Sequence, residues 1–300
     1  MTEANKTVHV PSHSEFYDLE DVSLNLDLQT GLCASSWGNL GYWCHPKSDA
    51  YSMSAKRLAT VLGEFAALSE NDIIFDVGFG CGDQLSVWRD DFRVAHIAGV
   101  NLSESQTRVA QASIESQRET VIHIQQGDAC IATDWQHVHR QTNKIIALDC
   151  VYHFSSKPSF LTLCQNQLTK LDKGNGAVIM SDFILTRSNI TLWQRVWLKL
   201  ICRLSHMPFT NLLTRSEYES MLNELGLKIT KTRNVSVEVM DGFAAWLPAF
   251  KDRYEQHRRN NSSIPKIHWA KYLGTACFLK WLRKHAIMEY HLIEVVPVAS

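Results

Sequence analysis

The sequence predicts an α/β fold, in which a doubly wound, mostly parallel seven-stranded sheet carries helical cap insertions. Short runs rich in β-branched residues alternate with helical segments along most of the chain. The runs are continuously apolar, which is typical of parallel strands buried on both faces. A glycine-rich turn follows the first run, where folds of this kind bind a ligand.

The expected elements follow one another in a regular order. Leu58, Val61, Leu62 and Phe65 fall on one face of a first helix. Strands are expected at residues 73–78, 96–103, 121–129, 144–154 and 176–185, with helices at 104–117 and 159–171. Residues 215–239 add a helix and a strand, and residues 288–298 supply a closing strand.

Two further stretches have a helical period but lie outside this alternation, and we expect them to cap the carboxyl edge of the sheet. The only obvious linker is the polar stretch at 258–266. The chain is therefore expected to divide into an N-terminal helical lid and entrance segment (1–70), a ligand-binding α/β core (71–185), a helical cap insertion (186–214), a continuation of the core (215–239), a second cap segment (240–285) and the closing strand (286–300).

Composition narrows the class of protein. A net charge of −1 over 300 residues gives no global field that would attract nucleic acid, so we expect no nucleic-acid partner. The eight cysteines form no CxxC pair, and without a signal peptide they indicate reduced thiols in the cytoplasm. No apolar run approaches the ~18–20 residues of a spanning helix. Residues 184–215 and 257–287 contain cations but no acid, which leaves peripheral contact with a membrane open.

The glycine-rich turn has an unusual spacing. Gly78, Gly80 and Gly82 stand two apart, with Asp76 just ahead of them and Asp83 just behind. A dinucleotide-binding turn has its third glycine one residue later. A carboxylate at Asp83 would also repel a pyrophosphate, so a cationic or zwitterionic ligand fits better and a nucleotide-dependent oxidoreductase is disfavoured.

The run DVGFGCG resembles the glycine motif of class I S-adenosylmethionine-dependent methyltransferases, and residues 42–239 follow the order of that family. The resemblance implies S-adenosyl-L-methionine as the cofactor. It implies that the three glycines let the loop pass beneath the methionine portion, that Asp76 orients the loop, and that Asp128 accepts a hydrogen bond from the adenine. The full set of cofactor-binding residues that it implies is Tyr42, Trp43, Asp76, Gly78, Gly80, Gly82, Gln84, Asn101, Leu102, Gln106, Asp128 and Ala129.

Asn101 departs from the family, which commonly has an acid there to hold the ribose hydroxyls. An amide bonds a hydroxyl more weakly, and Gln106 is expected to assist. Upstream, WGNLGYW at residues 37–43 resembles the entrance segment of the small-molecule and lipid branch, which includes sterol, tocopherol, sugar and cyclopropane-forming enzymes. There Tyr42 and Trp43 would fold over the sulfonium; an ordinary aromatic core cluster is the alternative.

The end of the fourth strand carries the candidate catalytic residues. Related cyclopropane synthases have Glu-His-Phe where this chain has Tyr152-His153-Phe154, so transfer to a heteroatom is favoured over chemistry on an alkene. His153 is the candidate base, with a hydrogen-bonded strand-end histidine as the alternative. Tyr152 would orient the acceptor, line the pocket or simply pack, and Asp149 is expected to cap or pair locally. No cluster has the spacing of metal ligands, so no metal is expected.

The expected function is transfer of a methyl group to an oxygen or nitrogen of a small apolar or amphiphilic molecule, such as a secondary metabolite. C-methylation and phospholipid-headgroup methylation are alternatives within the class, and an inactive cofactor-binding scaffold is the alternative outside it. In the first cap segment an apolar stripe runs beside a row of cations. We favour packing of this stripe on the sheet over a role as an interfacial anchor. The stripe comprises Trp193, Val196, Trp197, Leu200, Ile201 and Leu204, and the cations are Arg195, Lys199 and Arg203.

Overall fold

The computed structural model describes residues 19–116, 122–171, 176–261, 264 and 266–298. The first part of the expected lid segment, the last residue of the expected helix at 104–117 and parts of the linker at 258–266 lie outside these ranges. Within them, no helix is long and apolar enough to cross a bilayer.

The described residues confirm the α/β fold. Seven strands follow the order β3-β2-β1-β4-β5-β8-β7, and the two-residue β6 pairs with β5 beside this path. The strands are β1 (Ile73–Val77), β2 (His96–Asn101), β3 (Ile122–Gln126), β4 (Lys144–Ala147), β5 (Ala177–Leu185), β6 (Leu213–Thr214), β7 (Leu227–Asn234) and β8 (Met288–Pro297). β1 to β5 pair in parallel, whereas β8 runs antiparallel to both of its neighbours.

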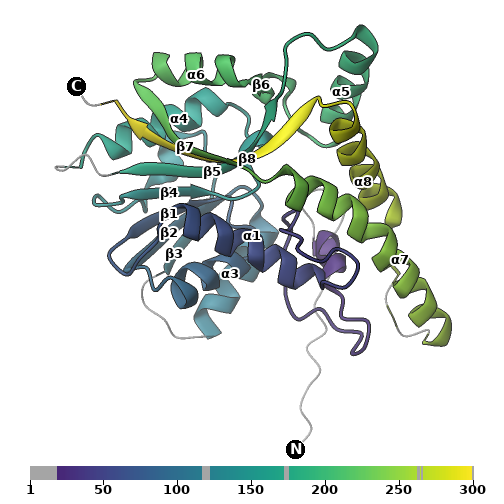
Figure 1. The fold of residues 1–300 in the computed structure, drawn as a ribbon. Helices are drawn as coiled ribbons and strands as arrows, with labels where there is room; N and C mark the ends of the chain where they lie inside the picture. The colour runs from purple at the N-terminus through teal and green to yellow at the C-terminus, as the bar shows by residue number, and fades with distance from the viewer. Residues whose placement is uncertain (1–18, 117–121, 172–175, 262–263, 265, 299–300) are drawn as a thin grey trace, which may run out of the picture.

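The two faces of the sheet are packed separately. Along β1, Ile74 points into one core, and Phe75 and Val77 point into the other, as the two-residue period of a strand requires. Helices α1 (Tyr51–Phe65) and α3 (Glu104–Ser116) cover the first face, and α4 (Lys157–Leu168) and α6 (Arg215–Glu224) cover the second (Figure 1). Burial on both faces explains why the strands are continuously apolar.

The cap segments are helical, as their period predicts. They form α5 (Leu192–Leu204), α7 (Gly242–Asn260) and α8 (Trp269–Lys284), which gather at one end of the sheet (Figure 1). Leu185, the last residue of β5, pairs with Met288, the first of β8. Because α5 follows β5 and α8 precedes β8, both helices connect at the carboxyl edge of the parallel strands.

Several expected strands end earlier than predicted, and the two largest differences are at β4 and β7. The run at 144–154 leaves the sheet after Ala147, because Asp149 adopts a left-handed backbone conformation with φ +56°. The 3-10 helix η4 (Val151–His153) follows at once. The strand expected to reach residue 239 ends at Asn234, whose side chain accepts a hydrogen bond from the backbone of Ser236 (2.9 Å).

The apolar stripe of α5 does not pack on the sheet domain, so the favoured expectation for it is wrong. The helix buries a different pair, Leu198 and Cys202, which stand one turn apart. Of the stripe, only Ile201 is half-buried, and the other five side chains are exposed.

Candidate active site

A cavity of about 310 Å³ lies at the carboxyl ends of β1, β2 and β4. Its size is within the range of small-molecule sites. Its lining comes from the entrance segment (36–39), the glycine loop and the start of the helix after it (78–81, 83 and 84), the end of β2 and the next helix (Val100, Leu102, Gln106), the loop at 127–129 and the end of β4 with η4 (148–150, 152–155).

All three glycines of the motif have positive φ, but only at Gly80 would a side chain find open space. A Cβ at Gly78 would stand 2.8 Å from the Cys150 sulfur, and one at Gly82 would stand 2.8 Å from Cβ of Ala110. A Cβ at Gly80 would meet no atom within 4 Å, and Gly80 lines the cavity. The loop is therefore a backbone cradle whose open side fits a ligand at Gly80.

Asp76 lies beneath this loop and is fully buried. Its carboxylate accepts hydrogen bonds from Gln84 Nε2 (2.8 and 3.0 Å) and from the indole N–H of Trp88 (2.6 Å). Burial raises its pKa to about 7, against the lowering effect of these two donors. Asp76 does not line the cavity, whereas Gln84 does. Asp76 therefore holds the helical segment that follows the loop, and it does not itself reach the cavity.

The amide of Asn101 is occupied by the protein. Its Oδ1 accepts from the backbone of Gly80 (3.2 Å), and its Nδ2 donates to Gln106 Oε1 (3.1 Å) and to the carbonyl of Ser103 (3.3 Å). Asn101 does not line the cavity, but Leu102 and Gln106 do. Asn101 thus ties the glycine loop to α3, and Gln106 is the member of this pair that lines the cavity.

Asp128 and Ala129 line the cavity, in the loop after β3. Asp128 Oδ1 accepts from the backbone of Cys130 (2.8 Å), and the Asp128 N–H donates to Asp134 Oδ2 (2.7 Å). A Cβ at Gly127 would stand 2.8 Å from Cβ of Asp134, so the loop is tightly packed. These contacts hold the Asp128 carboxylate in place at the wall of the cavity.

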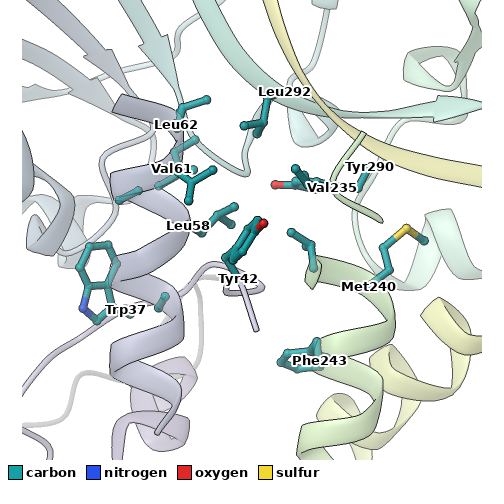
Figure 2. Packing of buried hydrophobic residues seen from close by; sticks show 14 of the residues in the cluster. Trp37, Tyr42, Leu58, Val61, Leu62, Val235, Met240, Phe243, Tyr290 and Leu292 are labelled. Atoms are coloured by element: carbon teal, nitrogen blue, oxygen red, sulfur yellow. The ribbon is translucent and has the colours of Figure 1, made fainter. Parts of the chain in front are cut away.

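Tyr42 and Trp43, expected over the cofactor, lie instead in the hydrophobic core, so the alternative of an aromatic core cluster holds for them. Trp43 stacks on Trp246 of α7 with ring centroids 4.6 Å apart. Tyr42 lies between Leu58 of α1 and Val235 in the cluster shown in Figure 2. The aromatic residue of the entrance segment that lines the cavity is Trp37, which the sequence reasoning did not select.

The entrance segment is held against the cavity by two carboxylates. Asp83 Oδ2 accepts from the backbone of Ser36 (3.0 Å), and Asp149 Oδ2 accepts from the backbone of Leu40 (2.7 Å). Asp83, whose charge disfavours a pyrophosphate ligand, therefore also fixes the entrance segment at Ser36.

Asp149 also accepts from two tyrosines, which makes it the polar centre of the cavity floor. The hydroxyls of Tyr152 (2.7 Å) and Tyr290 (2.5 Å) both donate to its Oδ1, and Tyr290 also contacts Ser181 Oγ (2.8 Å). Burial raises the pKa of Asp149, and these donors oppose the rise. Its partners include Leu40 and Tyr290, which are far away in sequence, so the expectation of local pairing covers only Tyr152.

Tyr152 and His153 both line the cavity, as predicted. Burial raises the pKa of Tyr152 well above its usual value, so the phenol stays protonated. Burial lowers the pKa of His153 to about 4, although a hydrogen bond to the backbone of His206 acts in the opposite direction. The ring is therefore neutral at physiological pH, and its pKa is lower than the ordinary value that the sequence reasoning assumed.

The thiol of Cys150 lies at the same edge and donates to the carbonyl of Val77 (3.2 Å). Burial raises its pKa well above the usual value, so it is a protonated thiol and not a nucleophile. Among the described residues, no three His, Cys, Asp or Glu side chains are grouped closely enough to hold a metal ion.

Comparison with known proteins shows the family. A family model described as mycolic acid cyclopropane synthetase matches residues 41–288, and the chain belongs to this family. It is a class I S-adenosylmethionine-dependent methyltransferase of the small-molecule branch, and its acceptor is a small molecule or a lipid. S-Adenosyl-L-methionine is its cofactor, and the open backbone at Gly80, in a cavity that Gln106 and Asp128 also line, fits that molecule.

Individual relatives are more distant. Erythromycin 3''-O-methyltransferase of Saccharopolyspora erythraea is 28% identical over 219 residues, which are 71% of this chain and 69% of that protein. The mycolic acid cyclopropane synthase CmaA1 has a TM-score of 0.67 at 14% identity, over 93% of this chain and 95% of its own. Geranyl diphosphate C-methyltransferase from Streptomyces coelicolor A3(2) has a TM-score of 0.64 at 13% identity, over 96% of this chain and 100% of its own. The two structural likenesses show the shared fold.

Proposed function

We propose that the protein transfers the methyl group of S-adenosylmethionine to an oxygen or nitrogen of a small apolar or amphiphilic molecule, with a hydroxyl oxygen as the first candidate. One observation carries this proposal: the glycine loop and the Tyr152-His153 pair line the same cavity. A methyl donor held at Gly80 and an acceptor held at His153 would therefore share one enclosed space.

The residues of the first part of the cavity are suited to hold the cofactor. The backbone at Gly80 would accommodate its methionine portion, Gln106 would bond the ribose, and Asp128 would accept from the adenine amino group. When bound, the cofactor supplies a methyl group on a sulfonium, which is already a good leaving group. The protein then has to position the acceptor, exclude water and remove a proton.

His153 is the group that would remove the proton. The imidazole is neutral because its pKa is lowered, so one of its ring nitrogens carries a lone pair that can accept a proton. As the new C–O bond forms and the C–S bond breaks, the hydroxyl proton would pass to this lone pair and later to solvent. A pKa of about 4 makes His153 a weak base, but it keeps the ring unprotonated at the start of the reaction.

Transfer to a heteroatom is supported by two further observations. Tyr152 stands where the related cyclopropane-forming enzymes have a glutamate, and its hydroxyl donates a hydrogen bond to Asp149. The curated relative at 28% identity is named as an O-methyltransferase. The C-methyltransferase among the structural neighbours keeps C-methylation as the second candidate, ahead of phospholipid-headgroup methylation and of an inactive scaffold.

The deciding experiment supplies the purified protein with isotopically labelled S-adenosylmethionine and extract fractions, and then identifies the labelled product. Mass spectrometry and NMR would locate the new methyl group, which we expect on a hydroxyl oxygen. The deoxy analogue of the identified acceptor is the matched control and should accept no label. A methyl group on carbon would overturn the proposal in favour of C-methylation, and cofactor binding without labelled product in any fraction would favour the scaffold.

A further inference from the structure

Helix α5 presents an uncovered apolar face. Six large apolar side chains on it are exposed, and the most exposed are Trp193 at 77% and Leu192 at 76%. The six, hereafter the α5 face, are Leu192, Trp193, Val196, Trp197, Leu200 and Leu204. Their spacing places them on one side of the helix, while Leu198 and Cys202 on another side attach it to the protein. An apolar face of this kind marks an interaction site.

The helix is capped at both ends by its own residues. Thr191 and Gln194 form a capping box at its start, in which each side chain bonds the backbone of the other residue (3.3 and 3.0 Å). After its end, the backbone of Met207 donates to the carbonyl of Cys202 (2.8 Å). The α5 face is therefore held open by a helix fixed at both ends.

Cations border the face along one side. Arg195, Lys199 and Arg203 follow at intervals of one turn, and all three are exposed. Residues 184–215 contain no acid, so nothing within this segment neutralises them. Lys199 also lies over the ring of Phe209, 5.4 Å from its centroid, which leaves its charge in place. The occupant of this surface must therefore be both apolar and anionic.

We infer that the α5 face docks on the surface of an anionic lipid bilayer. The combination of aromatic and aliphatic side chains with a row of basic residues is that of an interfacial helix. A second copy of the chain fits less well, because a two-fold interface would bring the same cations together without an acid in the segment to pair them. This surface does not depend on which acceptor the enzyme methylates.

Docking at α5 would act close to the cavity. Two residues after the helix, the backbone of His206 bonds the ring of His153. Further on, Asn211 Nδ2 donates to the carbonyls of Phe154 (2.7 Å) and Tyr152 (3.3 Å). The segment after α5 thus contacts residues 152–154, the wall of the cavity where the acceptor is expected. In a docked enzyme, this wall would therefore be connected to the helix that faces the membrane.

The test is co-sedimentation with phosphatidylcholine vesicles, with and without phosphatidylglycerol. We expect wild type to sediment with the anionic vesicles only, and Trp193→Ser/Trp197→Ser to lower the bound fraction by about tenfold or more. The matched control is Leu32→Ser, which removes an exposed apolar side chain (69% exposed) away from α5 and should bind as wild type. S-Adenosylhomocysteine binding should be equal in all three proteins, because none of these residues lines the cavity.

A second pair of variants separates the charge contribution. Arg195→Gln/Lys199→Gln/Arg203→Gln should weaken binding to anionic vesicles, whereas Lys47→Gln/Lys170→Gln/Lys228→Gln, with the same change in charge elsewhere, should not. Equal weakening by both sets, or unchanged binding of the double tryptophan variant, would overturn the proposal. So would a dimer in solution that the tryptophan variant abolishes, or an acidic protein that needs the α5 face while vesicles do not bind.

Discussion

Tyr290 donates a hydrogen bond of 2.5 Å to Asp149, which lies 141 residues earlier in the chain. The bond joins the closing strand β8 to the turn after β4. The same carboxylate fixes the entrance segment through the backbone of Leu40 and receives the hydroxyl of Tyr152. Asp149 therefore connects three separate parts of the chain at the floor of the cavity, and its left-handed φ is part of the turn that brings it there.

Replacing Tyr152 or Tyr290 by phenylalanine distinguishes a catalytic role of the Tyr152 hydroxyl from its structural hydrogen bond to Asp149. Each change removes one donor to Asp149 Oδ1, and each should lower the free energy of unfolding by about 1–3 kcal/mol. Only Tyr152 lines the cavity, so Tyr152→Phe should lower kcat further than Tyr290→Phe if its hydroxyl orients the acceptor. Urea unfolding and steady-state kinetics on both variants measure this. Equal losses of kcat would show that Tyr152 acts through Asp149 alone.

Valine at Gly80 should block the cofactor while the protein stays folded. The side chain would enter the open space of the cavity, and we expect S-adenosylhomocysteine to bind at least about tenfold more weakly by calorimetry. The comparison variant Gly82→Ala also places a side chain at a positive φ (+95°, against +60° at Gly80), but its Cβ would stand 2.8 Å from Cβ of Ala110, so it should mainly lower stability. If Gly80→Val binds as wild type, the cofactor does not pass over this loop.

The fold could be predicted because its signals are local. The apolar strands, the helical spacing from Leu58 to Phe65 and the glycine run each lie within a few residues, and the structure confirms the elements that they predict. The end of β4 could not be predicted in this way. The turn at Asp149 is stabilised by Leu40 and Tyr290, which come close to it only in the folded protein. For the same reason, the apolar side of α5 was visible in the sequence but its exposure was not.

In the candidate site, too, the local signals could be predicted from the sequence and the tertiary contacts could not. The sequence placed an aromatic entrance segment beside the glycine loop, yet a loop without a period does not reveal which of its rings faces inward. Trp37 lines the cavity, and Tyr42 and Trp43 pack in the core. Asn101 is a candidate from its position at the end of β2, but its amide forms hydrogen bonds with Gly80 and Gln106 instead. Such pairings depend on tertiary distances that a sequence does not contain.

Asp76 predicts a pH dependence of stability. Its pKa is about 7 in the folded protein, against an ordinary value of 3.8 for an aspartate, so the folded state binds the proton more tightly than the unfolded chain does. Its contribution is fully present below about pH 4 and is lost as pH rises to about 7, by about 4 kcal/mol in all. Asp76→Asn should flatten this dependence in urea unfolding at several pH values. Asp252→Asn, which removes an exposed carboxylate, should keep it, and an unchanged slope in Asp76→Asn would refute the assignment.

The sharpest prediction concerns the pH profile of His153. Its pKa is about 4, so the imidazole can accept a proton throughout the neutral range. Turnover of an oxygen acceptor should therefore not fall as pH drops through the ordinary histidine pKa of about 6.5, but only as it approaches about 4. His153→Ala should lower turnover by ~10²–10⁴-fold, the range for a positioned base, and should leave S-adenosylhomocysteine affinity nearly unchanged.

His206→Asn is the control for this variant. It removes the neighbouring imidazole but keeps the backbone that bonds His153, and asparagine tolerates the left-handed φ of +49° at this position. We expect its rate and pH profile to stay close to wild type. Kinetics from about pH 4 to about pH 9 would compare the three proteins. Equal rates in wild type and His153→Ala would show that His153 is a packing residue. Catalysis would then rest on the positioning of the two substrates alone.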